Sequence, residues 1–199
     1  SRSGEPYDRQ LWATLAQAGL LGTAIGEEHG GTGLGLTELC FLLEEQGRTL
    51  AAVPLLATLV LGALPVQKFG SAAQCAALLP RVVSGEALLT AALEETGVGD
   101  PLRPAVKATA SGEGWRLRGV KSCVPYGAQA QAILVTARTG RHSVGVFLVD
   151  PQARGVRIES QPTTSGEPQA QVTLTNVRVS AADVLGDAYV YLIGQFASG

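Results

Sequence analysis

The spacing of apolar residues changes from a helical period to a period of two near residue 88, and this change divides the chain. Before it, apolar residues recur at three- and four-residue intervals, as in Leu55, Leu59 and Ala63, which would line one face of a helix. After it, short apolar runs bounded by glycine, proline and polar residues follow one another, as in β-sheets. We therefore predict an α+β fold, in which an N-terminal α-helical bundle precedes an antiparallel β-barrel or sandwich.

Four helices are predicted in the first part, and three of them have recognisable ends. One spans residues 5–18 and ends at Gly19, a common helix stop. Thr37 is the expected N-cap of the second. The fourth begins with the capping box Ser71-Ala-Ala-Gln74, and Pro80 is expected to kink or restart it.

The second part contains a hairpin signal, because two alternating segments flank Ser111-Gly-Glu-Gly114. Further strands are predicted at residues 132–136, 144–149, 156–158, 170–174 and 177–179. Many short strands at this spacing are typical of an antiparallel barrel or sandwich.

Composition and charge exclude several classes of protein. Hydrophobic residues make up 46% of the 199 residues and charged residues 16%, which indicates a globular chain with a core. The formal net charge is −2, so no basic excess is available to bind nucleic acid. The uncharged stretch from Leu50 to Val66 is shorter than a membrane span requires, and Pro54 and Pro65 bracket a shorter helix inside it. We predict that this helix is buried in protein and that the chain has no membrane span.

The cysteines and histidines indicate neither disulfides nor a metal site. Cys40, Cys75 and Cys123 are odd in number and far apart, so we predict buried, reduced thiols in a cytoplasmic protein. His29 and His142 lie far apart and no CxxC pair is present, so no metal site is expected.

Five segments, in order, resemble motifs of the acyl-CoA dehydrogenase family. They are Gly26-Glu-Glu-His-Gly-Gly-Thr-Gly-Leu34 ("PEEYGGxGL"), Leu43-Glu-Glu-Gln-Gly-Arg48 ("EELGR"), residues 68–86 ("GSEEQ…LPRLASGE"), Glu94-Glu-Thr-Gly-Val-Gly-Asp100 ("TEPGAGSD") and Asn176-Val-Arg-Val179 with Asp183-Val-Leu-Gly186 ("NVRVPADAVLG"). The match covers roughly residues 5–187. It implies a helical domain at 1–88, a middle β-domain at 89–187 and, at 188–199, the start of a C-terminal four-helix bundle that is largely absent from this sequence.

The resemblance also implies an activity, a cofactor and partners. It implies FAD, an acyl-CoA substrate, an electron-transfer flavoprotein-type acceptor and a homo- or hetero-oligomer. In the family reaction a Glu removes the α-proton while FAD accepts hydride from Cβ. That Glu belongs to the C-terminal bundle, so we assign no catalytic residue within these 199 residues.

The resemblance places flavin contacts in two segments. The cofactor-binding candidates are Leu93, Glu94, Gly97, Gly99, Asp100, Cys123, Val124 and Pro125. Four of them depart from the family pattern: Glu94 replaces Thr, Asp100 replaces Ser, Cys123 replaces Trp and Pro125 replaces Thr.

Several residues in and beside these two segments also have a purely structural interpretation. Glu94, Glu95 and Asp100 would be solvated turn residues, with Arg103 able to pair with Asp100. Cys123 is expected as a buried thiol beside the flavin ring. Lys121 is expected as a surface or packing residue.

Several functions remain open at this point. The altered flavin residues favour one subunit of a heteromeric acyl-CoA dehydrogenase, similar to bacterial enzymes of sterol side-chain degradation, over an active homomer. A flavin-free structural subunit and a related flavin monooxygenase or nitroalkane oxidase are the alternatives. Residues 1–199 alone are expected to expose an apolar face and to self-associate.

Overall fold

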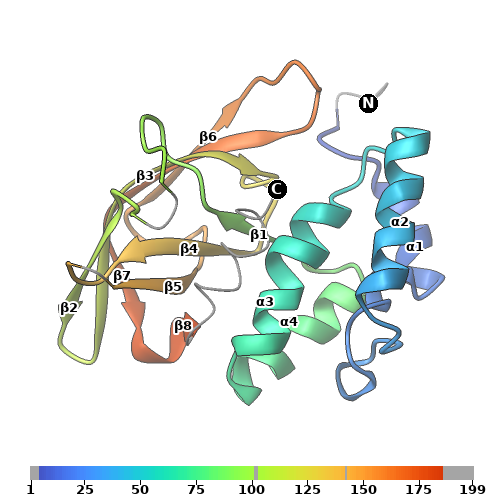
Figure 1. Cartoon of the computed structure of the whole chain (residues 1–199), viewed down its shortest axis with the longest axis horizontal. Helices are drawn as coiled ribbons and strands as arrows, with labels where there is room; N and C mark the ends of the chain where they lie inside the picture. The colour runs from blue at the N-terminus through green and yellow to red at the C-terminus, as the bar shows by residue number, and fades with distance from the viewer. Residues whose placement is uncertain (1–4, 101–102, 142, 186–199) are drawn as a thin grey trace.

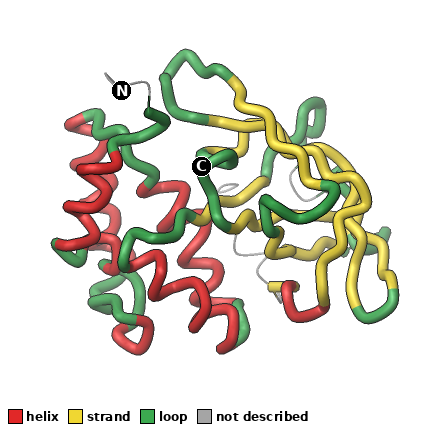
Figure 2. Tube along the Cα trace, turned by 180° about the vertical axis from the view of Figure 1, so that it is seen from behind, coloured by secondary structure: helices red, strands yellow, loops and turns green. Residues whose placement is uncertain are grey.

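The computed structural model describes residues 5–100, 103–141 and 143–185, and in these the helices and the strands form two adjoining bodies (Figure 1). The view from behind shows the same division, with helices on one side and strands on the other (Figure 2). The helical segments are α1 (Arg9–Gln17), η1 (Leu20–Gly22), η2 (Glu27–His29), α2 (Leu36–Thr49), η3 (Leu56–Ala63), α3 (Leu64–Phe69), α4 (Ala72–Val83) and η4 (Ala181–Asp183). The strands are β1 (Leu89–Ala92), β2 (Lys107–Ser111), β3 (Gly114–Pro125), β4 (Ala132–Arg138), β5 (Val144–Val149), β6 (Val156–Gln161), β7 (Gln169–Ser180) and β8 (Val184–Leu185).

The ends of α1 follow from its capping residues. Asp8 accepts a hydrogen bond from the Leu11 amide at 2.8 Å, so the helix begins after Asp8 and not at residue 5. Gly19 follows with a φ of 73°, which confirms the predicted stop. The Trp12 indole nitrogen donates to the Gly85 carbonyl at 3.0 Å and ties α1 to the end of α4.

Helix α2 does not begin as predicted. Its N-cap is Gly35, with a φ of 125°, and Thr37 lies inside the first turn. The prediction of a Thr37 cap was wrong because the preceding glycine-rich loop already turns the chain at Gly35.

The apolar segment after Pro54 is a π-helix, η3, and not an α-helix. Hydrogen bonds in a π-helix join residues five apart, so the expected stripe drifts around its axis. Leu55 and Leu59 are buried, whereas the neighbouring Leu56 is exposed.

The capping box of α4 is confirmed. The Gln74 amide donates to Ser71 Oγ at 3.2 Å, and the Ser71 amide donates to Gln74 Oε1 at 2.8 Å. The helix nevertheless continues through Pro80 to Val83, so the expected restart does not occur.

The eight strands form one sheet in the order β6-β7-β3-β2-β4-β5-β8, with β1 paired to β4. Most pairs are antiparallel, and the hairpin predicted at residues 111–114 joins β2 to β3. The pairs β1–β4 and β2–β4 are parallel. Within the described residues β6 and β8 end the ladder, so the sheet is open. The prediction of a helical domain followed by an antiparallel β-domain is confirmed, and the sheet does not close into a barrel.

The central strands separate two hydrophobic cores. Leu89 and Leu134 face the core shared with the helices, whereas Ile133 and Phe147 face a second core enclosed by the sheet. Because successive side chains of a strand point to opposite faces, β4 is buried on both. The β1–β4–β5 layer thus lies between the helices and the rest of the sheet.

Two predictions concern the ends and the membrane. The start of a C-terminal helix, predicted at 188–199, lies outside the described residues. In the part of the chain that the structure describes, no helix has both the length and the apolar character needed to cross a membrane.

Candidate cofactor site

The two segments predicted to contact a flavin lie side by side. The first, residues 93–100, follows the end of β1, and the second, residues 123–125, ends β3. The Ser122 amide donates to the Glu94 carbonyl at 2.9 Å and joins the two directly. Two segments that are distant in sequence are thereby joined in one frame at the site.

A buried ion pair fixes this frame from inside. Lys121 Nζ lies 2.7 Å from Glu95 Oε1, and the two side chains are 0% and 4% exposed. The lysine also donates to Thr136 Oγ1 at 2.8 Å and to the Leu93 carbonyl at 3.3 Å. Because Lys121 precedes the second segment and Glu95 lies in the first, the pair connects both segments to β4.

The Glu95 carboxylate also holds the far end of its own loop. It accepts the Ala105 amide at 2.6 Å and the Val106 amide at 3.2 Å. A buried charge needs such partners, because its transfer from water is otherwise costly. Glu95 is therefore not a solvated turn residue, and that interpretation was wrong. Of the two interpretations of Lys121, surface or packing, its burial excludes the surface one.

The pKa of Lys121 reflects two opposing influences. Burial lowers this pKa because the ammonium loses its hydration, whereas the hydrogen bond to the Glu95 carboxylate and its negative charge act in the opposite direction. The carboxylate is the negative charge in direct contact with this ammonium.

The first segment forms an open turn. Gly97 has a φ of 79°, and an added Cβ at Gly97 or Gly99 would meet nothing within 4 Å. A small hollow of about 110 Å³ is lined by Leu93, Glu94 and Gly99, among others. Glu94 and Asp100 are exposed, as the solvated-turn interpretation expects.

The end of this turn carries the expected ion pair. Arg103 Nε lies 3.5 Å from Asp100 Oδ2, and both side chains are at least half exposed. Exposed pairs of this kind contribute roughly 0–1 kcal/mol. The pair compensates the charge of Asp100 without ordering the turn strongly.

The second segment presents its backbone and an exposed thiol. A register shift between Lys121 and Val124 places Cys123 at a φ of 53°, and its amide donates to Gln161 Oε1 at 3.0 Å. Cys123 is exposed, so the expectation of a buried thiol was wrong, because the bulge turns this side chain out of the sheet. Val124 points into the sheet core with 1% exposure.

The last candidate, Pro125, is half-buried and offers no amide donor. Its carbonyl already accepts Thr90 Oγ1 at 2.7 Å. The next residue, Tyr126, is buried at a φ of 51°, and its amide donates to the Pro168 carbonyl at 2.8 Å. Burial and the charge of Glu167 raise the pKa of Tyr126 to about 12.

The backbone of the two segments is therefore compatible with a flavin, whereas their side chains are not those of the family pattern. The two segments converge and the glycine turn is open, so its backbone is accessible to a ligand. The side chains at Glu94, Cys123 and Pro125 contain none of the hydroxyl donors that the family pattern places at 94 and 125. Of the eight candidates, Val124 could offer a ligand only its backbone, because its side chain is in the core.

The remaining thiols and the metal prediction concern other parts of the chain. Cys75 is buried, as predicted, and burial raises the pKa of its thiol, whereas Cys40 is exposed, against the prediction. Residues 5–100, 103–141 and 143–185 contain no group of three His, Cys, Asp or Glu side chains that could hold a metal ion.

Lys121 and Glu95 are the residues that sequence reasoning missed at this site. In the family pattern the second flavin segment reads "KMWITNG" and corresponds to residues 121–127, so Lys121 stands at its Lys, and Glu95 stands at the Glu of "TEPGAGSD". That position was the available signal, since a charged residue retained in a motif otherwise rich in apolar and small residues indicates a specific partner.

Comparison with known proteins agrees with this frame. Residues 2–86 match the profile of the acyl-CoA dehydrogenase N-terminal domain, and residues 90–178 match that of the acyl-CoA dehydrogenase middle domain. Acyl-CoA dehydrogenase FadE28 of Mycobacterium tuberculosis is 39% identical over 186 residues, which cover 94% of this chain and 52% of FadE28. FadE27 of the same organism is 38% identical, with 94% of this chain and 49% of FadE27 covered.

Solved structures show the same fold. A variant of the Tcur3481-Tcur3483 steroid ACAD superimposes with a TM-score of 0.88 at 46% identity, covering 96% of this chain and 52% of that one. The ChsE4-ChsE5 complex from Mycobacterium tuberculosis gives a TM-score of 0.87 at 36% identity, covering 95% and 51%. The chain thus spans about half the length of the relatives that it matches.

Proposed function

Since this chain belongs to the acyl-CoA dehydrogenase family, we propose that it forms part of one subunit of a heteromeric enzyme that desaturates an acyl-CoA thioester between its α- and β-carbons. The chain would contribute the helical domain and the middle domain of that subunit, with the predicted boundary between residues 88 and 89. A cytoplasmic location and an electron-transfer flavoprotein-type acceptor belong to the same proposal.

The observation that carries the proposal is the buried ion pair between Lys121 and Glu95. This pair and the Ser122–Glu94 hydrogen bond join the two segments that contain the eight residues proposed to surround FAD. Bound FAD would supply the hydride acceptor of the reaction. Gly97, Gly99 and the backbone at Cys123 would form the surface that faces the flavin. The Lys121–Glu95 ion pair would hold this surface in position.

The heteromeric form rests on two supports. The solved structures of similar sequence include one described as the ChsE4-ChsE5 complex and one of the Tcur3481-Tcur3483 steroid ACAD. The exposed carboxylate of Glu94 and the proline ring at 125 weaken the flavin surface of this chain. A partner subunit that brings the catalytic Glu and further cofactor contacts would compensate for both, and a bulky, steroid-type acyl-CoA is the substrate class we infer.

Flavin content tests the proposal. The complete protein would be purified alone and after co-expression with a second acyl-CoA dehydrogenase subunit from the same organism, and both samples would be examined by absorbance. We expect the flavin spectrum in the co-purified complex, and bleaching of that spectrum when a steroid acyl-CoA is added without oxygen.

A flavin-free structural subunit is the second candidate function, and Glu94 and Pro125 favour it. A carboxylate repels a pyrophosphate unless a cation pairs with it, and Glu94 forms no ion pair with any described residue. A stable complex that contains no flavin would support this second function and overturn the first.

A further inference from the structure

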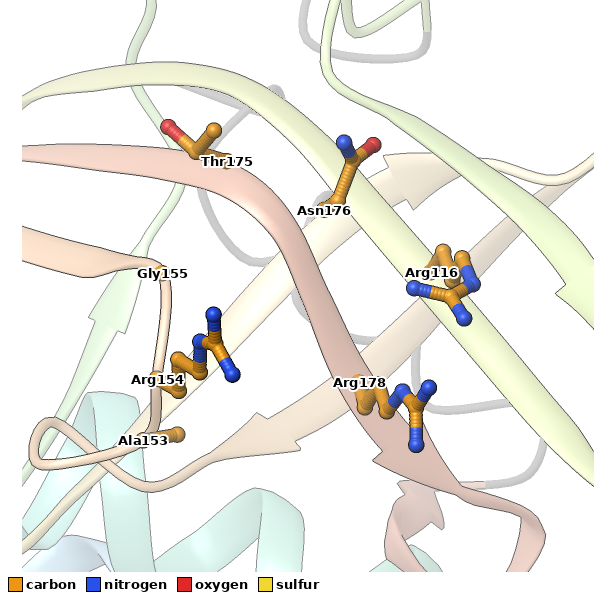
Figure 3. A pocket seen from close by; sticks show the side chains of 7 residues that line it. All are labelled: Arg116, Ala153, Arg154, Gly155, Thr175, Asn176 and Arg178. Carbon is orange, nitrogen blue, oxygen red and sulfur yellow. The ribbon is translucent and has the colours of Figure 1, made fainter.

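Three arginines meet on the outer face of the sheet, at the end of β3 away from the candidate cofactor site. Arg116 on β3 and Arg178 on β7 are direct register partners, and Arg154 stands in the turn before β6. Figure 3 shows the three side chains arriving from separate segments at one hollow. Cys123 follows Arg116 by seven positions along β3, which corresponds to roughly 20 Å in a strand.

This arrangement is unfavourable without a counter-charge. Like charges directly opposite each other on neighbouring strands destabilise a sheet. The adjoining register pair, Lys107 with Arg118, is also doubly cationic. Among the described residues, no carboxylate forms an ion pair with Arg116, Arg154 or Arg178, although Arg116 Nε donates to Ser111 Oγ at 3.0 Å.

Two carboxylates lie in an adjacent hollow. Glu113 and Asp183 line that hollow, which shares Arg116 and Arg178 with the first. Asp183 Oδ2 accepts Ser180 Oγ at 2.7 Å. By contrast Arg157, on β6, has the Glu159 carboxylate at 2.8 Å, so cations elsewhere on this sheet do find partners.

The backbone holds the hollow in shape. The Thr175 amide donates to the Gly155 carbonyl at 2.8 Å, which presses the Arg154 turn against β7. Gly155 has a φ of 96°, and a Cβ there would lie 2.5 Å from the Thr175 carbonyl oxygen, so the turn requires glycine. Asn176, which follows Thr175 on β7, adopts a φ of 54° beside the register shift between β3 and β7 and lines the same hollow.

We propose that this hollow binds a small phosphate-bearing anion. Its volume is about 700 Å³, within the range of small-molecule sites. Guanidinium forks match the oxygen geometry of phosphate and form paired, charge-assisted hydrogen bonds with it. The bound anion neutralises the Arg116–Arg178 repulsion. The concave wall built from three segments favours a small molecule over a flat acidic protein surface.

Binding to the complete enzyme tests this proposal. Inorganic phosphate and adenosine monophosphate would be titrated by calorimetry into the wild-type enzyme and into the variants Arg178→Gln and Arg154→Gln, with sodium chloride keeping the ionic strength constant. We expect at least tenfold weaker binding at this site in each variant. Tighter binding of the nucleotide than of phosphate would assign an organic phosphate, and equal binding would assign the free ion.

A matched control separates this site from general charge. Arg157→Gln removes an equally exposed, paired cation on the neighbouring strand and should leave the affinity unchanged. Without phosphate and at low ionic strength, Arg178→Gln should unfold at a higher temperature than the wild type, because the repulsion is gone, and phosphate should no longer raise that temperature. Equal weakening in Arg157→Gln, or the same stabilisation by chloride as by phosphate, would overturn the proposal and leave the arginines to screening or to an acidic protein partner.

Discussion

At the scale of single residues, the Lys121–Glu95 pair combines a desolvation cost with several compensating bonds. Removing one member leaves the other charge buried without its ionic partner, which typically costs about 3–5 kcal/mol. Lys121→Met should lower the free energy of unfolding by that amount, as measured by chemical denaturation of the complete protein.

The double variant makes the origin of this loss measurable. In Lys121→Met with Glu95→Gln, the glutamine oxygen can still accept the Ala105 and Val106 amides, and no buried charge remains. It should therefore be more stable than Lys121→Met alone, with an interaction energy that a double-mutant cycle reports. Arg48→Gln, which breaks the exposed pair with Glu45, is the control and should change stability by less than about 1 kcal/mol. A Lys121→Met loss as small as this control would contradict the assignment of a buried pair.

Tyr126 gives the fold a predictable response to alkaline pH. Its folded pKa of about 12 exceeds the usual value of 10.0, so between these pH values the unfolded chain loses its proton first. The stabilisation is complete below about pH 10 and is lost as the pH rises through the folded pKa. Tyr126→Phe should lessen the fall in unfolding free energy between about pH 10 and 12, measured against the wild type. Identical pH profiles would contradict this burial effect.

Residue burial is also where the sequence was least informative. Cys40 and Cys75 both stand in apolar helical patterns, yet only Cys75 is buried. Lys121 and Glu95 lie far enough apart in sequence that no local pattern identifies their pairing. Sequence periodicity reports which face of an element is apolar, but a buried charge depends on a partner that only the tertiary fold supplies.

At the scale of elements, η3 packs directly on β1 through a glycine. A Cβ added at Gly62 would overlap Leu89 Cβ and lie 3.0 Å from the Leu89 carbonyl carbon. Because η3 and β1 would have to separate, Gly62→Ala should cost about 1–3 kcal/mol of unfolding free energy.

Gly47 in α2 provides the matched substitution. An added Cβ there meets nothing within 4 Å, so Gly47→Ala should stabilise the protein by up to about 1 kcal/mol through helix propensity. Thermal unfolding of both variants would show shifts of opposite sign. Two shifts of the same sign would show that the η3–β1 contact is less tight than the structure has it.

Elements whose ends depend on local chemistry could be predicted from sequence, and those set by tertiary packing could not. The capping box at Ser71 and the hairpin at 111–114 are encoded within four residues each, and both are confirmed. The π-helical winding of η3 and the parallel pairing of β1 with β4 depend on contacts across the two cores. The convergence of the two candidate flavin segments belongs to the second kind, which is why the resemblance located them and the residue pattern alone did not.

At the scale of the whole molecule, apolar side chains are exposed on and around α2. Leu34, Phe41 and Leu50 are 63%, 61% and 88% exposed, and all three belong to the helical region. Large apolar groups exposed on one region of a protein mark surfaces that other protein covers. A polypeptide limited to residues 1–199 should therefore self-associate, and light scattering should report a mass that rises with concentration.

The double variant Phe41→Ser with Leu50→Ser should restore the monomer. The control is Val120→Ser, at an exposed apolar position on β3, which should leave association unchanged. A compact monomer at all concentrations in the unsubstituted polypeptide would show that the helical region needs no such cover.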